Sequence, residues 1–132
     1  MTTTKMPANS KAAKVLQYEL SHAMQTYDEA RTEYADRLAQ GDSASYMAEW
    51  HMVDLIERET LAQLAYEYTT DDPDATWDQA VEHFIMRMEE SLSHMRGASG
   101  STSGATRLVE QITIATKTKL YAKVMKAQRS ES

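Results

Sequence analysis

Large aliphatic side chains are scarce in this chain. Leu, Ile, Val and Phe together supply 19 of the 132 residues. That share is about 14%, below the roughly 20% that marks a poor core former. The apolar fraction of 42% comes instead largely from Ala, Met and Tyr, with 18, 9 and 7 residues. This composition favours helices that approach one another closely around a small core, and a small core commonly gains stability from a partner subunit.

The length suits one domain, and the composition excludes several chemistries. With no Cys, the chain has no disulfides, no thiolate catalysis and no Cys-based zinc sites, and with 4 Gly it lacks a Gly-rich phosphate loop. No segment is apolar enough to span a bilayer, and the opening Met-Thr-Thr-Thr-Lys-Met-Pro lacks the apolar stretch of a signal peptide. We therefore expect a cytoplasmic protein.

Hydrophobic periodicity predicts a first helix from 10 to 40. Ser10 is a suitable N-cap, and Gly41 is the usual residue just past a helix end. Between them, residues at alternating spacings of three and four form a coiled-coil-like seam: Ala13, Leu16, Leu20, Ala23, Tyr27, Ala30 and Tyr34. The small Ala residues in this seam allow a close helix neighbour.

Two further helices are predicted on either side of a turn at 69–74. The second follows the cap formed by Asp42 and Ser43 and runs to about Tyr68. The third begins at a capping box formed by Thr76 and Gln79 and ends before Gly97. Its stripe is the most regular in the chain: Trp77, Val81, Phe84, Met88, Leu92 and Met95.

Residues 97–104 form a flexible Gly/Ser linker, and a fourth, basic, amphipathic helix is predicted at 105–129. Because 112–119 is rich in β-branched residues, a strand there is an alternative. We predict an all-α fold with an antiparallel three-helix bundle plus the fourth helix. Its parts are a disordered N-terminus at 1–9, an acidic bundle at 10–96, the linker and the basic helix.

The charge distribution is uneven along the chain. Residues 1–100 carry a net charge of −10, and residues 101–132 carry +4. One interpretation is a docking helix for a nucleic acid, an anionic membrane surface or an unidentified protein partner. The other is a helix that folds back on the acidic body of its own chain or of a neighbouring subunit. The candidate partner-binding residues are Lys119, Lys123, Lys126, Arg129, Leu120, Tyr121, Val124 and Met125.

One pair of residues suggests catalysis. Arg87 and His94 have the Arg-x6-His spacing that resembles helical ribonucleases of the HEPN type. The match is limited to two residues, and Met88 stands where those enzymes usually carry a polar residue. We therefore prefer a solvated stripe in which Arg87 pairs with Glu90 and Glu90 with His94.

A carboxylate-bridged metal site in a helical bundle needs Glu on several helices and more than one Glu-x-x-His motif. Glu19 and His22 have that spacing, but the third helix has no second motif. Asp54 and Glu57 are better explained as helix-surface or intersubunit partners of Arg31, Arg37 or a lysine of the C-terminal helix. We predict no metal and no cofactor.

Apolar residues also fall on faces that should be exposed, and this favours self-association. They are Met52, Leu55, Ile56, Tyr66 and Met86. The predicted function is that of a non-enzymatic, small helical assembly or adaptor protein, a homo-oligomer whose C-terminal helix docks on a neighbouring subunit or partner. Nucleic-acid association through the same helix is the alternative.

Overall fold

The computed structural model describes residues 5–39, 45–70, 72, 74–97 and 104–130 and contains four helices in these ranges. Helix α1 spans Lys11–Ala39, α2 spans Ser45–Thr70, α3 spans Trp77–Gly97 and α4 spans Gly104–Ser130. No strand occurs in this described part of the chain, so the all-α prediction is confirmed. Residues 112–119 are helical. Residues 98–103, most of the predicted linker, lie outside the described ranges.

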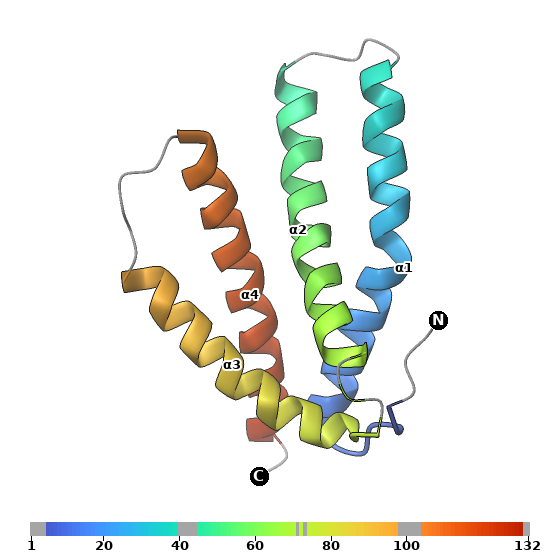
Figure 1. Cartoon of the computed structure of the whole chain (residues 1–132), viewed down its shortest axis with the longest axis vertical. Helices are drawn as coiled ribbons and strands as arrows, with labels where there is room; N and C mark the ends of the chain where they lie inside the picture. The colour runs from blue at the N-terminus through green and yellow to red at the C-terminus, as the bar shows by residue number, and fades with distance from the viewer. Residues whose placement is uncertain (1–4, 40–44, 71, 73, 98–103, 131–132) are drawn as a thin grey trace.

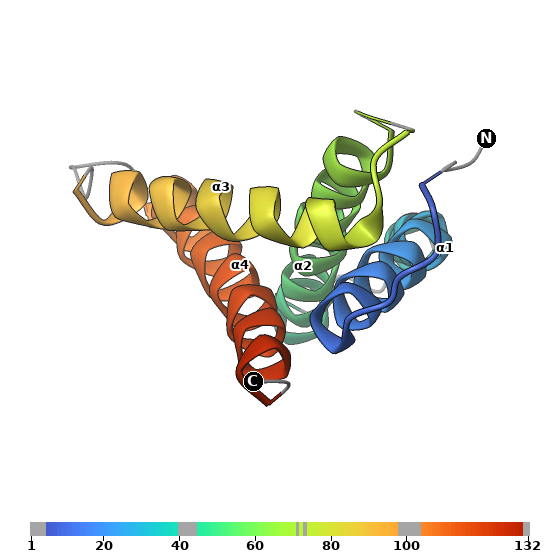
Figure 2. The ribbon, with the colours of Figure 1, turned by 90° about the horizontal axis from the view of Figure 1, so that it is seen from below.

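The helices form two hairpins that pack at an angle to each other. In Figure 1, α1 and α2 stand side by side as the taller hairpin, and α3 and α4 diverge from one another on its flank. Seen from below, the start of α1 lies close to the end of α4 (Figure 2). The upper ends of α1 and α2 rise above the upper end of α4, which leans away from them (Figure 1). The fold therefore leaves part of the first hairpin uncovered by the second.

Local signals begin α1 and α3 where the sequence predicts them. The Ser10 side chain accepts a hydrogen bond from the Ala13 N–H at 3.0 Å, which is the N-cap of α1. At α3, the Thr76 N–H donates to Gln79 Oε1 at 2.9 Å and the Gln79 N–H donates to Thr76 Oγ1 at 3.1 Å. This reciprocal pair is the predicted capping box.

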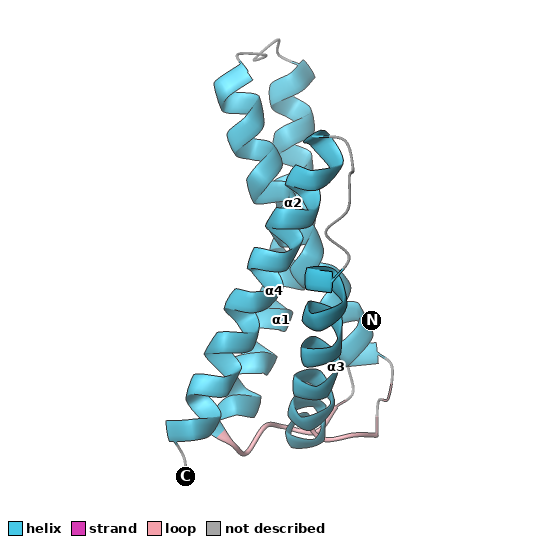
Figure 3. Cartoon of the chain, turned by 90° about the vertical axis from the view of Figure 1, so that its left-hand side faces the viewer, coloured by secondary structure: helices cyan, strands magenta, loops and turns pink. Residues whose placement is uncertain are grey.

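Part of the N-terminal segment predicted to be disordered contacts the turn before α3, while residues 1–4 lie outside the described ranges. Residues 5–9 run past the connection between α2 and α3, at the end of the molecule where the described loops gather (Figure 3). Lys5 Nζ donates to the Asp72 backbone oxygen at 2.8 Å, and Met6 forms a single β-bridge with Thr76. Because the turn offers backbone partners and Ala8 packs against the core, this segment is ordered there.

The core is small, and all four helices contribute to it. The largest fully buried side chains include Trp77 and Phe84 of α3 and Leu16 and Leu20 of α1. Helix α4 contributes Leu120, Val124 and Ala127 to the same cluster: Leu120 is 2% exposed and Val124 is fully buried. The fourth helix is therefore an integral part of the bundle. Of the two interpretations of this helix, the one in which it folds back on the body of its own chain agrees with the structure.

A side chain of α3 anchors the start of α1. The Ser10 N–H donates to Asp78 Oδ1 at 3.0 Å. Hydrogen bonds from the Ser10 side chain and backbone lower the pKa of Asp78 below its ordinary value, and the Asn9 backbone acts in the same direction. The ionised carboxylate is also favoured because it lies in the first turn of α3.

This contact predicts a pH-dependent effect of Asp78→Asn. Since the folded pKa of Asp78 is lowered, its stabilisation is present above the unfolded value of about 3.9 and is lost as the pH falls through the lower folded value. At neutral pH, we expect the variant to lose about 1 kcal/mol or less, because the site is partly exposed. Thermal unfolding measured at pH 7 and near pH 2 checks this. An equal loss at both pH values would show that the ionised carboxylate is not responsible.

Candidate interaction surfaces

The structure divides the predicted partner-binding residues of α4 into two groups. Leu120 and Val124 face the chain's own core, so their assignment as partner contacts is wrong for this fold. Tyr121 and Met125 are half-buried, and the Tyr121 hydroxyl donates to Glu89 Oε2 at 2.8 Å. This hydrogen bond is the main reason that the pKa of Tyr121 is raised.

The four basic residues of α4 that were predicted to bind a partner remain exposed, and one of them contacts α1. Lys119, Lys126 and Arg129 are exposed. Lys123 Nζ lies 3.2 Å from Glu19 Oε2, so the basic helix is paired with the body in cis at this point. Glu19, which the sequence placed beside His22 at metal-ligand spacing, thus acts as an ion-pair partner.

The packing of α1 against α4 brings two basic segments of the chain together, at the end of the molecule that also holds Asp72 and Asp78. Residues 5–27 and 111–130 together hold eight of the 14 Lys and Arg residues but one of the 20 Asp and Glu residues. Residues 28–110 hold 18 acidic residues and six Arg. The contact between Lys123 and Glu19 brings the two basic segments side by side. These basic segments include Lys11 and Lys14, which the division of the chain at residue 100 assigned to the acidic body.

The predicted self-association residues of α2 lie on a stripe that the other helices leave largely open. Met52 is 43% exposed, Tyr66 is 70% exposed, and Leu55 is half-buried. With Glu59 and Ala62, they recur at spacings of three and four along the outside of the helix, and we name these five residues the α2 outer stripe. The hydroxyl of Tyr27 in α1 donates to Glu59 Oε2 at 3.3 Å.

The other two predicted self-association residues lie elsewhere. Ile56 is half-buried and lines a groove of about 190 Å³ between α2 and α4, together with Val109 and Thr113. Met86 is 52% exposed on α3, on the opposite side of that helix from Phe84. The structure therefore joins Met52, Leu55 and Tyr66 on one surface but does not add Met86 to it.

The catalytic candidates do not form the predicted pairs. Arg87 Nη2 lies 2.8 Å from Glu67 Oε1 of α2, so its ion pair crosses between helices and does not involve Glu90. His94 is exposed and lines an open surface pocket together with Arg87, Glu90, Ser91 and Ser93, so the two candidates share one surface without contacting each other. An arginine engaged by a carboxylate is less available to steady a phosphate group.

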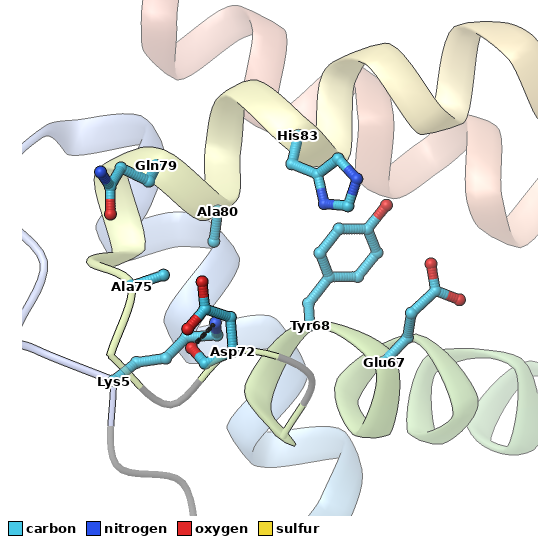
Figure 4. Close-up of a pocket in the computed structure, with 8 residues that line it drawn as sticks. All are labelled: Lys5, Glu67, Tyr68, Asp72, Ala75, Gln79, Ala80 and His83. Atoms are coloured by element: carbon cyan, nitrogen blue, oxygen red, sulfur yellow. Dashed lines mark hydrogen bonds between the residues drawn. The ribbon is translucent and has the colours of Figure 1, made fainter.

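A second concave site lies where the N-terminal segment crosses the turn before α3. It has a volume of about 250 Å³, and Figure 4 shows the side chains that line it. The His83 ring lies edge-on to the Tyr68 ring at 5.7 Å between centroids, and Tyr68 makes a similar contact with Phe84 at 5.5 Å. The hydrogen bond from Lys5 to Asp72 closes the opposite side (Figure 4). These residues mainly hold the N-terminal segment, the end of α2 and the start of α3 together.

Searches of the described ranges give two further findings. No three His, Asp or Glu residues there are grouped in a way that could hold a metal ion. No described helix is both long and apolar enough to cross a membrane.

Sequence reasoning missed several exposed apolar and aromatic residues. Tyr18 and His22 stack on the outside of α1, with ring centroids 5.7 Å apart and ring planes 6° from parallel. Leu108 and Val109 are exposed at the start of α4. The spacing of four between Tyr18 and His22 was a usable signal, because such residues are neighbours on a helix surface.

In comparisons with known proteins, no family model, curated protein or solved structure matches this chain.

Proposed function

We propose that this protein is a non-enzymatic, small helical assembly or adaptor protein that self-associates through the α2 outer stripe. The observation that carries the proposal is that α2 is apolar on two faces. Its inner face supplies Leu64, Ala65 and Tyr68 to the core. Its outer stripe keeps Met52 and Tyr66 exposed. A surface helix of a monomer needs one apolar stripe, so the second stripe is best explained by a partner helix.

The pattern of the stripe fits a helical partner. Spacings of three and four place successive side chains along one seam, as in coiled coils. Burying a Met side chain completely contributes about 1.5–3 kcal/mol, and an aromatic ring buries still more surface. The chain's own core is small and rich in Ala, so an interface of this kind adds substantially to its stability.

The proposal is tested by the solution mass of a double variant, Met52→Glu with Tyr66→Glu. We expect the wild-type chain to form an oligomer and the double variant to have the monomer mass of 14.9 kDa. The reason is that two carboxylates placed in an apolar contact lose hydration without gaining partners. Light scattering during gel filtration measures both masses.

Met86→Glu is the matched control, because Met86 is similarly exposed but lies on α3, away from the stripe. It should leave the mass of the oligomer unchanged. A wild-type chain that stays monomeric at all concentrations, or a double variant that keeps the wild-type mass, contradicts the proposal.

A second candidate function is nucleic-acid association through the exposed lysines of α4. The charge segregation favours it, because Lys119 and Lys126 lie in one of the two basic segments. That function predicts binding of an oligonucleotide that weakens steeply with salt and is lost when Lys119, Lys123 and Lys126 are changed to Glu.

A further inference from the structure

Helix α1 carries an exposed charged stripe whose sign changes along its length. Within an arc of about 100° at 100° per residue, which also includes Val15 and Thr32, lie eight exposed residues with charged, aromatic or amide side chains. They form the α1 stripe: Lys11, Lys14, Tyr18, His22, Gln25, Glu29, Glu33 and Asp36. The half near the start of the helix is basic and aromatic, and the half near its end is acidic.

This charge order opposes the dipole of its own helix. Acidic groups stabilise a helix near its N-terminus and basic groups near its C-terminus. The first turn of α1 contains no acidic residue and includes Lys11 and Lys14, while Glu33 and Asp36 lie near the other end. By contrast, α3 has Asp78 in its first turn and α4 has Arg129 in its last turn. The order in α1 is therefore not explained by the stability of that helix.

The stripe is complementary to a reversed copy of itself. Its members pair about the point between Ala23 and Met24, and the partners of each pair are equally far from that point along the chain. The pairs are Lys11 with Asp36, Lys14 with Glu33, Tyr18 with Glu29, and His22 with Gln25. Two of them join opposite charges, one joins a phenol with a carboxylate, and one joins two polar side chains.

We propose that α1 packs antiparallel against the α1 of a second copy, about a two-fold axis that passes near residues 23 and 24. In an isologous interface of this type, each pair occurs twice. The proposal rests on the proposed self-association and names the contact that sets the orientation of the two chains. The α1 stripe and the α2 outer stripe lie on neighbouring helices of one hairpin.

The neighbouring helix strengthens the basic half of the stripe. The ion pair between Lys123 and Glu19 sets α4 beside this part of α1, and Lys119 and Lys126 are exposed nearby on α4. The acidic half of a second copy meets this basic half. A nucleic acid fits the stripe less well, because a phosphate backbone that followed it beyond His22 would meet Glu29, Glu33 and Asp36.

Two charge-reversal variants test the contact. The first is Lys11→Glu with Lys14→Glu, which makes both halves of the stripe acidic. The second is Glu33→Lys with Asp36→Lys, which makes both halves basic. We expect each variant alone to weaken self-association at least tenfold in Kd, because like charges then face each other. An equimolar mixture should restore association, since an acidic stripe then faces a basic one.

Two controls separate an effect on the contact from an effect on folding and from an effect on net charge. Each reversal replaces charges that the α1 dipole disfavours at one end of the helix, so helical content by circular dichroism should not fall. The variant Glu82→Lys with Glu110→Lys changes the net charge as much as the second reversal, at exposed residues of α3 and α4 outside the stripe. It should associate like the wild type.

The outcomes separate this contact from the proposed function. In one outcome, the wild type associates, and each reversal variant and their mixture associate with the same Kd as the wild type. The α1 contact is then wrong, while self-association through α2 stands. If the wild type is monomeric, both fail. If the first reversal abolishes binding of a single-stranded oligonucleotide but leaves the solution mass unchanged, the basic half serves a nucleic acid and the α1 contact is overturned.

Discussion

Leu120→Ala is expected to lower the free energy of unfolding by about 2–5 kcal/mol. Leu120 is 2% exposed and belongs to the cluster that joins α4 to the other helices. Its truncation removes the burial of several apolar groups and leaves a cavity that the surrounding helices fill only in part. Since small domains have a total stability of about 5–15 kcal/mol, much of the chain should unfold at moderate denaturant concentrations.

Chemical denaturation followed by circular dichroism measures this loss. Val109→Ala is the matched control on the same helix, because Val109 is exposed, and it should change the stability by less than about 0.5 kcal/mol. A Leu120→Ala variant as stable as the wild type would mean that Leu120 serves a partner and that α4 is not required by the core.

Phe84→Ala is expected to cost about 3–5 kcal/mol. Phe84 is fully buried in α3 and lies edge-on to Tyr68 of α2, with 5.5 Å between the ring centroids. Removing the ring takes away its buried surface and this aromatic contact together. The site lies where α3 meets the first hairpin, so the two hairpins should separate more readily.

Met86→Ala is the control for this substitution, because it lies two residues away but on the exposed side of α3. It should leave the midpoint of denaturation nearly unchanged. Equal midpoints for the Phe84→Ala and Met86→Ala variants would contradict the burial pattern of α3.

The sequence predicted features that depend on neighbouring residues. The bounds of α1 and α3 follow from Ser10, from Thr76 with Gln79, and from Gly97, and each of these acts within one helical turn. The inner stripes of α1 and α3 were predictable for the same reason, because helical spacing determines which residues share a face.

Features that depend on packing between distant segments were not predictable. The surface of α4 carries two apolar patches, and only the assembled bundle determines that Leu120 and Val124 face inward. The partner of Arg87 is Glu67, which is on another helix and has no spacing rule relative to it. The order of residues 5–9 likewise depends on the turn between α2 and α3.

The candidate surfaces were predicted in part. Met52 and Tyr66 were identified because an apolar residue on a polar face is visible in the helical pattern. The basic segments were identified only at α4, because Lys11 and Lys14 belong to a segment whose average charge is negative. Only the tertiary contact between Lys123 and Glu19 shows that the segment with Lys11 and Lys14 lies beside α4.

The most direct test of self-association is the solution mass of the purified chain, measured by light scattering over a range of protein and salt concentrations. We expect an oligomer of at least twice 14.9 kDa, because Met52 and Tyr66 of the α2 outer stripe are exposed in the single chain and the proposed contact with a second copy would cover them. Raising the salt from about 0.1 M to about 1 M shortens the Debye length from about 10 Å to about 3 Å, so it should weaken the α1 contact and raise the Kd. A mass of 14.9 kDa at every protein and salt concentration would contradict the account.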